Sequence, residues 1–394
     1  MNRFRSLDIF RGATVALMIL VNNPGTWSHI YAPLDHAEWE GCTPTDLVFP
    51  FFLFAVGNAL AFVMPKLEEK NIFWAKVIKR TLLIFFIGLF LSWFPFIKWS
   101  DDHLVMKPWA FINSDRNEDG VRILGVLQRI AICYFFAAVI IHFFKLRGTF
   151  VVAAILLLGY WGLIVMGNPS DPYSMTGYFG RNVDIAVLGK SHMLHLDKVD
   201  GKMFHFDYEG LTSSIAAIAQ VLLGYLVGDF IIKRGKNAEM LNVLFVLGTV
   251  LAALGMIWGM NFPIVKKIWT SSYTIYTTGL ALLILGVMIY LIEFKGRDGW
   301  LSRFFDVFGK NALFIFVLSG LLPRAMGLIR IPNGVNPEGK QVYLTPLSWF
   351  YDTVCKPIIP SEPRIGSVLY ALCFILFMWF LAWLLNRKKI YIKV

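Results

Sequence analysis

A histidine among acidic and amide side chains is the first feature of this chain that suggests chemistry. His36 lies between Asp35 and the pair Glu38 and Glu40, and Asn22 precedes it in the chain. An imidazole has an ordinary pKa of about 6.5, so it can act as a general base or a nucleophile at neutral pH. A lone histidine in a polar loop is usually only solvated. The hypothesis that His36 and Asn22 are catalytic therefore depends on these neighbours, which could tune and orient the ring.

Two charged residues near apolar stretches are candidates for binding a substrate. Asp46 follows Thr43 and Pro44, a pattern that is also typical of a helix start, so helix capping explains it equally well. Arg129 lies about two turns inside the apolar stretch 122–144, where a guanidinium needs a carboxylate or a bound anion. Because Asp46 lies at a matching depth, we expect it to pair with Arg129.

Three further polar residues occur within apolar stretches. Asp8 and Arg11 are three residues apart, so they share one helix face and can form a local ion pair, anchor to lipid headgroups or have a functional role. Asn311 lies inside the apolar stretch 305–322, where its amide can bond between helices.

The polar segment 167–210 carries histidines and carboxylates. His192 and His195 stand three apart, and Asp207 and Glu209 follow. This spacing is loose for a metal site, so we expect no metal and favour a solvated or sugar-binding loop. The two carboxylates precede the next apolar stretch, where helix capping is the simpler explanation, although Glu209 is also a candidate for binding substrate.

A hydroxyl-rich and aromatic motif opens another apolar stretch. Trp269 to Tyr273 reads Trp-Thr-Ser-Ser-Tyr and follows Lys266 and Lys267. Trp269 and Ser272 could line a sugar site, and an aromatic belt at the membrane interface is an equally good interpretation.

The composition predicts the elements that position these residues. The chain has 394 residues, of which 57% are hydrophobic and 16% are charged, and its mean hydropathy is +0.61. Such a composition excludes a disordered chain and, with four cysteines, a disulfide scaffold; it predicts an all-α, polytopic membrane helix bundle. Ten stretches are long and apolar enough to span a bilayer: 8–24, 45–64, 74–95, 122–144, 149–166, 211–232, 240–260, 270–293, 305–322 and 366–386.

The distribution of lysine and arginine predicts the orientation. The positive charges gather in alternate connections and at both ends, so we expect both termini in the cytoplasm, and the net charge of +11 reflects this bias rather than nucleic-acid binding. We read residues 1–394 as one membrane domain. Its outer loops are 25–44, 96–121, 167–210 and 323–364. Cys42 and Cys355 both fall in these loops and could pair, although nothing in the sequence requires it.

Taken together, the motifs resemble the heparan-alpha-glucosaminide N-acetyltransferase family. The likeness covers nearly the whole chain in order, and its N-terminal block is the most specific. It rests on the segments 7–12, 21–22, 36–41, 45–51, 125–131, 206–211, 268–273 and 309–313.

The resemblance implies a transmembrane acetyltransferase that takes acetyl from cytoplasmic acetyl-CoA and delivers it to the amine of an amino sugar on the far side. The family's active-site histidine falls on His36 and its partner asparagine on Asn22. Arg11 and Asn311 are our candidates for contacting acetyl-CoA. The chain is similar to the short bacterial form of the family, which predicts the bacterial inner membrane and allows a homodimer. Tyr208 stands where a proline is common, and the acceptor stays open.

Two other functions fit the same residues. A secondary transporter of a sugar or organic anion would use buried Asp46 and Arg129. An O-acetyltransferase of a surface glycan would share the donor and differ in the acceptor.

Overall fold

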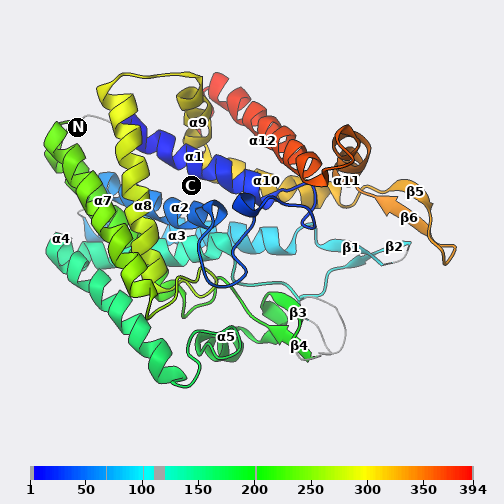
Figure 1. Cartoon of the computed structure of the whole chain (residues 1–394), viewed down its shortest axis with the longest axis horizontal. Helices are drawn as coiled ribbons and strands as arrows, with labels where there is room; N and C mark the ends of the chain where they lie inside the picture. The colour runs from blue at the N-terminus through cyan, green and yellow to red at the C-terminus, as the bar shows by residue number, and fades with distance from the viewer. Residues whose placement is uncertain (1–3, 68, 101, 111–119, 200–201, 393–394) are drawn as a thin grey trace.

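The computed structural model describes residues 4–67, 69–100, 102–110, 120–199 and 202–392, which form a mostly helical bundle with three β-hairpins (Figure 1). The helices are α1 (Arg5–Asn22), α2 (Val48–Val63), α3 (Lys70–Trp93), α4 (Val126–Gly167), α5 (Gly180–Leu188), α6 (Ser214–Arg234), α7 (Ala238–Gly259), α8 (Ser271–Ile289), α9 (Trp300–Lys310), α10 (Ala312–Met326), α11 (Pro346–Phe350) and α12 (Pro363–Arg387). The antiparallel hairpins pair β1 (Ile97–Ser100) with β2 (His103–Met106), β3 (His195–Val199) with β4 (Lys202–His205), and β5 (Ile331–Val335) with β6 (Gln341–Leu344).

Within the described residues, six helices are long and apolar enough to cross a membrane, or seven if the bent pair α9–α10 counts as one span. This supports the predicted membrane bundle, whereas the predicted count of ten stays a prediction. One of the six, α4, has 42 residues, about 63 Å at 1.5 Å per residue, roughly twice the hydrocarbon thickness. It bends at Lys145, whose φ of 55° is not helical, between the two stretches that we predict as separate spans, 122–144 and 149–166 (Figure 1).

The span predicted at 305–322 is bent in the structure. The helix breaks at Asn311, and α9 and α10 meet at 82°. Asn311 adopts a φ of −127°, outside the helical range, and its side-chain amide bonds to another segment. The apolar pattern alone does not reveal such a break, because hydrophobicity continues across it.

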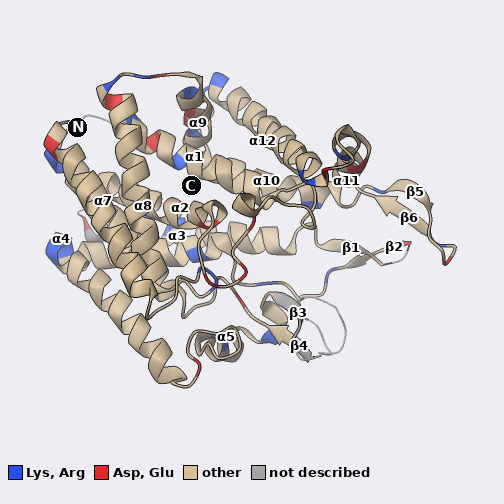
Figure 2. Cartoon of the chain, in the orientation of Figure 1, with Lys and Arg blue, Asp and Glu red and all other residues tan. Residues whose placement is uncertain are grey.

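The start of α1 and the C-terminal tail lie at the same end of the bundle as the α8–α9 connection. Arg5 at the start of α1 pairs with Asp298 at 2.7 Å, and Asn311 bonds to the backbone of Ile390 and Ile392. The three hairpins lie toward the other end (Figure 1). Lysine and arginine mark the bend of α4 and the end of α12, both away from the hairpins (Figure 2).

Helices α2 and α6 approach closely through glycine. A Cβ added at Gly57 would lie 2.0 Å from the carbonyl oxygen of Val221, and one added at Gly224 would lie 2.2 Å from that of Phe54. Small residues allow helix backbones to come together in this way inside membranes. This contact supports the start of α2, which carries the site described below.

We expect Gly57→Ala to destabilise the bundle by about 1–3 kcal/mol, because the new methyl group must push α6 away. Gly159→Ala in α4 is the matched control, since nothing lies within 4 Å of its added Cβ. The measurement is thermal unfolding of the purified proteins in one detergent. Equal melting temperatures for the two variants would contradict the close approach.

Candidate active site

His36 is held by the turn that leads into α2. After α1 ends at Asn22, the chain forms an irregular loop and enters a short 3₁₀ helix, η2 (Pro44–Leu47). Asp46 caps this helix, because its Oδ2 accepts hydrogen bonds from the backbone N–H and the hydroxyl of Thr43, both at 3.1 Å. The predicted capping function of Asp46 is therefore confirmed.

The same carboxylate also binds the imidazole. The Nδ1 atom of His36 lies 2.7 Å from Oδ1 of Asp46, and the Ala37 N–H donates to Oδ2 at 3.1 Å. The Asp46 side chain is 1% exposed, whereas that of His36 is 35% exposed. When Nδ1–H donates to the buried carboxylate, Nε2 is the unprotonated nitrogen of the ring. This arrangement orients an imidazole as a base.

A lysine completes the group. The ammonium nitrogen of Lys266 lies 3.2 Å from Oδ1 of Asp46 and 3.0 Å from Nδ1 of His36. Burial lowers the pKa of Lys266, and the nearby Asp46 opposes that shift. The positive charge compensates the buried carboxylate.

These three side chains line a small pocket of about 100 Å³. The rest of the lining comes from the turn after η2, from the segment before α6 and from the loop before α8. Its other residues are Ala37, Phe49, Tyr208, Glu209, Lys267 and Trp269. Of the predicted substrate-binding residues, Asp46, Glu209 and Trp269 thus lie together with His36.

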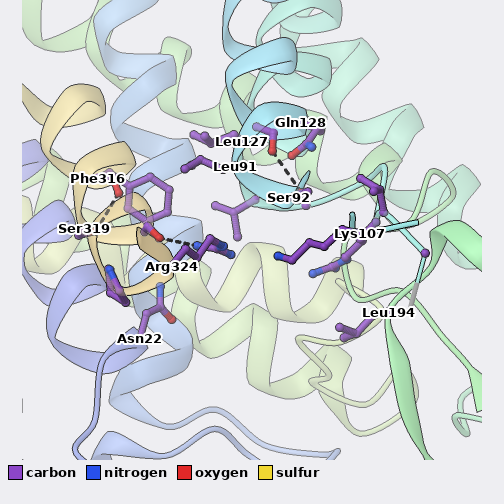
Figure 3. A pocket seen from close by; sticks show the side chains of 18 of the residues that line it. Asn22, Leu91, Ser92, Lys107, Leu127, Gln128, Leu194, Phe316, Ser319 and Arg324 are labelled. Atoms are coloured by element: carbon purple, nitrogen blue, oxygen red, sulfur yellow. Dashed lines mark hydrogen bonds between the residues drawn. The ribbon is translucent and has the colours of Figure 1, made fainter. Parts of the chain in front are cut away.

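Asn22 lies in a different and wider cavity of about 1060 Å³. This cavity is bounded by the C-terminal end of α3, the start of α4 and the C-terminal part of α10 (Figure 3). It reaches from Arg324 to Phe316, eight residues or about 12 Å along α10. The sequence predicts Asn22 and His36 as one catalytic pair, but they line separate cavities.

An ion-pair cluster stands between the two cavities. Arg122 lines the wide cavity, and its guanidinium donates to Asp207 at 3.1 Å and 2.6 Å and also to Glu209. Glu209 in turn lines the small pocket. Arg122 lowers the pKa of Glu209, although burial opposes that shift. The Arg122–Glu209 pair therefore forms part of the wall that separates His36 from the wide cavity.

The predicted pair of Arg129 and Asp46 is wrong. The Nη2 atom of Arg129 donates to the Gly210 carbonyl at 3.1 Å and to the Ser213 hydroxyl, and the guanidinium lies over the Trp269 ring at 5.1 Å. Its Nε and Nη1 atoms have no partner in the described part of the chain. Asp46 instead uses its two oxygens for the cap, His36 and Lys266. Arg129 thus supports the pocket through Trp269 rather than lining it.

Ser272 does not line the pocket either. It is fully buried, and its hydroxyl donates to the carbonyl of Phe262 at 2.5 Å. This bond fixes the loop that carries Lys266 and Trp269. Trp269 adopts a φ of 50° in that loop and packs edge-on against Phe49. Ser272 therefore positions the site from behind.

The two residues predicted to contact acetyl-CoA lie elsewhere in the bundle. Arg11 pairs with Asp8 at 3.0 Å, which confirms the predicted ion pair, and also donates to the Gly309 carbonyl at 2.7 Å. The Asn311 side chain donates to the Ile390 carbonyl at 3.0 Å and accepts from the Ile392 N–H at 2.8 Å. Neither residue lines the two cavities.

Other predictions for the polar segments have clear outcomes. Asp207 and Glu209 pair with Arg122 and do not cap α6, which starts at Ser214. The side chain of His195 lies outside the described residues. Among the described residues, no group of three or more metal-ligating side chains could hold an ion.

All four cysteines are free thiols, so the pairing of Cys42 with Cys355 does not occur in this structure. Cys42 lies close to the small pocket in sequence, between His36 and Asp46. Burial raises the pKa of the Cys42 thiol to about 12, and the charge of Asp46 adds to this shift. A protonated thiol is a weak nucleophile, so Cys42 is not a competing catalytic group.

Sequence reasoning missed Lys266 and Arg122 as site residues. Lys266 and Lys267 are cations on the predicted outer side, where the positive-inside rule makes them unusual, and that was an available signal. Arg122 and the acidic pair 207 and 209 all precede apolar stretches that start on the outer side. Because these residues have opposite charges and lie at a similar predicted depth, the contact of Arg122 with Asp207 and Glu209 could have been predicted.

The chain is similar to known proteins over most of its length. A family model described as a domain of unknown function, DUF5009, matches residues 3–101, which include His36 and Asp46. The human heparan-alpha-glucosaminide N-acetyltransferase is 25% identical over 367 residues, and the mouse protein of the same name is 24% identical over 368 residues. Both alignments cover 80% of this chain.

The predicted resemblance to this family is therefore confirmed. The chain spans about half the length of these curated relatives, since the alignments cover 52% of the human protein and 53% of the mouse protein.

Proposed function

We propose that this chain is a membrane acetyltransferase that moves the acetyl group of acetyl-CoA to the amine of an amino sugar. One observation carries the proposal: an imidazole is bound through Nδ1 to a buried carboxylate, His36 to Asp46, and lines a small pocket. The likeness to two N-acetyltransferases that act on a glucosaminide supports acetyl transfer, and it supports an amino sugar as the proposed acceptor.

The proposed chemistry uses the free nitrogen of the ring. Nε2 of His36 accepts a proton from the acceptor amine as the amine nitrogen attacks the thioester carbonyl carbon. A C–N bond forms, the C–S bond breaks, and the CoA sulfur leaves as a thiolate that takes up the proton. In an alternative route, Nε2 first accepts the acetyl group and then passes it to the amine. Asp46 stabilises the positive charge on the ring in both routes.

The wide cavity is the proposed path for the thioester. Asn22 lies in it and can donate a hydrogen bond to the thioester carbonyl before the acetyl group reaches His36. For the acetyl group to reach His36 from this cavity, the contact of Arg122 with Glu209 must open. Tyr208, Glu209 and Trp269 are the proposed contacts of the sugar, since they line the small pocket around His36.

We propose that both termini face the cytoplasm of a bacterial cell and that the protein lies in its inner membrane. Acetyl-CoA would then approach from the end that carries the start of α1 and the C-terminal tail, because its phosphates cannot enter the hydrocarbon region unaided. Arg11 and Asn311 at that end are the proposed nucleotide contacts. A homodimer is compatible with this arrangement.

Acetyl transfer by the purified protein in lipid nanodiscs tests the proposal. We expect labelled acetyl-CoA to give N-acetylglucosamine from glucosamine, with one CoA thiol released for each acetyl group transferred. Glucose, which lacks the amine, is the matched control acceptor. Transfer to glucose as fast as to glucosamine would favour the O-acetyltransferase alternative. Sugar uptake into proteoliposomes without acetyl-CoA, together with no transfer, would overturn the proposal in favour of a transporter.

Lys266 should be needed for full activity. Its ammonium nitrogen lies 3.2 Å from Oδ1 of Asp46, the carboxylate that orients His36. Lys266→Met leaves this buried carboxylate without its cation, so the rate of acetyl transfer, measured with labelled acetyl-CoA and glucosamine, should fall by about tenfold.

Lys266→Arg is the control for this experiment, since it keeps the charge. Its rate should stay close to that of the unmodified protein. An unchanged rate in Lys266→Met would show that the lysine only fills space.

A further inference from the structure

The outer end of the wide cavity carries three cations. Lys98, Lys107 and Arg324 line it, from β1, the segment after β2 and α10. Figure 3 shows Lys107 and Arg324 reaching toward each other across the opening. Lys107 donates to the Phe94 carbonyl at 3.3 Å, and Arg324 donates to the Gly320 carbonyl at 2.7 Å. In the part of the chain that the structure describes, none of the three has a carboxylate partner.

This cluster is costly without a negative partner. Burial lowers the pKa of Lys107, and the charges of Arg324 and Lys98 lower it further. Like charges in a cavity repel one another and attract an anion. The fourth cation of the lining, Arg122, is already neutralised by two carboxylates. Among the described residues, the cations without a carboxylate partner therefore gather at the outer end of the cavity.

An unpaired amide lies at the inner end. Gln128 lines the cavity, its side chain is 1% exposed, and its Nε2 atom has no partner among the described residues (Figure 3). A buried donor without an acceptor is unfavourable, so it indicates a bound group. The lining also includes apolar side chains, among them Leu91, Leu127 and Phe316.

We propose that the wide cavity is a binding site for a molecule with a phosphate or sulfate group. Lys98, Lys107 and Arg324 contact the anionic oxygens, and the less polar part of the molecule extends inward, where a carbonyl or hydroxyl oxygen accepts from Gln128. This site is distinct from the pocket of His36, because Arg122 and Glu209 lie between them. Binding there does not require acetyl transfer to occur.

Three molecules could bring this group. A phosphorylated amino sugar would be an acceptor, and a phospholipid would present its headgroup from the bilayer. Coenzyme A bound here would have its nucleotide at the opposite end from the one proposed above. All three share the oxyanion that the cations recognise. The first experiment therefore measures binding of the shared group, and a second experiment identifies the molecule that carries it.

Calorimetric titration of the purified full chain with inorganic phosphate, without acetyl-CoA, tests the shared group. We expect Lys107→Met and Arg324→Met each to weaken binding by about tenfold, since each removes a charge-assisted hydrogen bond. Lys340→Met is the matched control, because Lys340 is an exposed lysine beyond the cavity, just before β6, and should leave binding unchanged. Relief of charge repulsion should leave both cavity variants at least as heat-stable as the unmodified protein.

Competition with phosphate identifies the source. We compare three competitors: glucosamine 6-phosphate, coenzyme A and a short-chain phosphatidic acid. The compound that displaces phosphate at the lowest concentration is identified as the source of the bound oxyanion. Gln128→Leu should weaken the binding of that compound and leave the binding of inorganic phosphate unchanged. Phosphate binding that is absent, or equal in Lys107→Met and Lys340→Met, would overturn the site. Because the readout is binding, this result is independent of whether acetyl transfer is observed.

Discussion

Replacing His36 with alanine is expected to lower the rate of acetyl transfer by a factor of about 10² to 10⁴, the usual contribution of a positioned general base. The reason is geometric. The imidazole is the group that Asp46 orients at 2.7 Å, and it lines the small pocket together with Tyr208 and Trp269. Since a third of its side chain is exposed, its removal should leave the fold intact. Rates with labelled acetyl-CoA and glucosamine give the measurement.

A second substitution separates orientation from chemistry. In Asp46→Asn, the amide can still accept from the Thr43 and Ala37 N–H groups but no longer stabilises a charged ring. We expect a large loss of rate together with a lower melting temperature, because Lys266 loses its carboxylate partner. His36→Ala with full activity would contradict the function of the imidazole, and trapping of acetyl on His36 in the unmodified protein would select the nucleophilic route.

The helices could be predicted from the sequence because the length of an apolar stretch is a local property of the chain. Each of the ten predicted stretches falls on a helix, and the gap between 144 and 149 coincides with the bend at Lys145. The break at Asn311 could not be predicted in the same way. It depends on bonds between its amide and the C-terminal tail, 79 and 81 residues away.

The site was predicted only in part, for the same reason. His36 and Asp46 are ten residues apart and joined by one loop, so their contact is nearly local. Lys266 reaches them from 230 residues away. Arg129 was predicted as the partner of Asp46 because both residues lie at a similar depth along the bundle axis. Equal depth does not show that two side chains lie on facing sides of their helices. The contact with Lys266 also requires the rotation of α8 and the shape of its preceding loop, which the sequence pattern does not specify.

Removing the charge of Arg122 should have the largest effect on stability. Its guanidinium holds Asp207 through two bonds and also contacts Glu209, and Asp207 is 2% exposed. Arg122→Leu would leave two neighbouring carboxylates buried without a cation. Breaking a buried pair in this way costs about 3–5 kcal/mol. Thermal unfolding in detergent at pH 7 should show a marked loss.

The pH dependence of this variant distinguishes charge from packing. Burial already raises the pKa of Asp207, and without Arg122 the folded protein should hold protons on these carboxylates at still higher pH. A carboxyl group whose pKa is higher in the folded state than in the unfolded state stabilises the fold at low pH, and this stabilisation is lost as pH rises. Arg122→Leu should therefore regain stability between pH 7 and pH 5, while Arg122→Lys should depend less on pH. Equal loss at both pH values would mean that the guanidinium acts by packing alone. Arg122 also belongs to the wall between the cavities. If stability recovers at pH 5 but acetyl transfer stays slower than in the unmodified protein at the same pH, Arg122 has a second role, in guiding the thioester to His36.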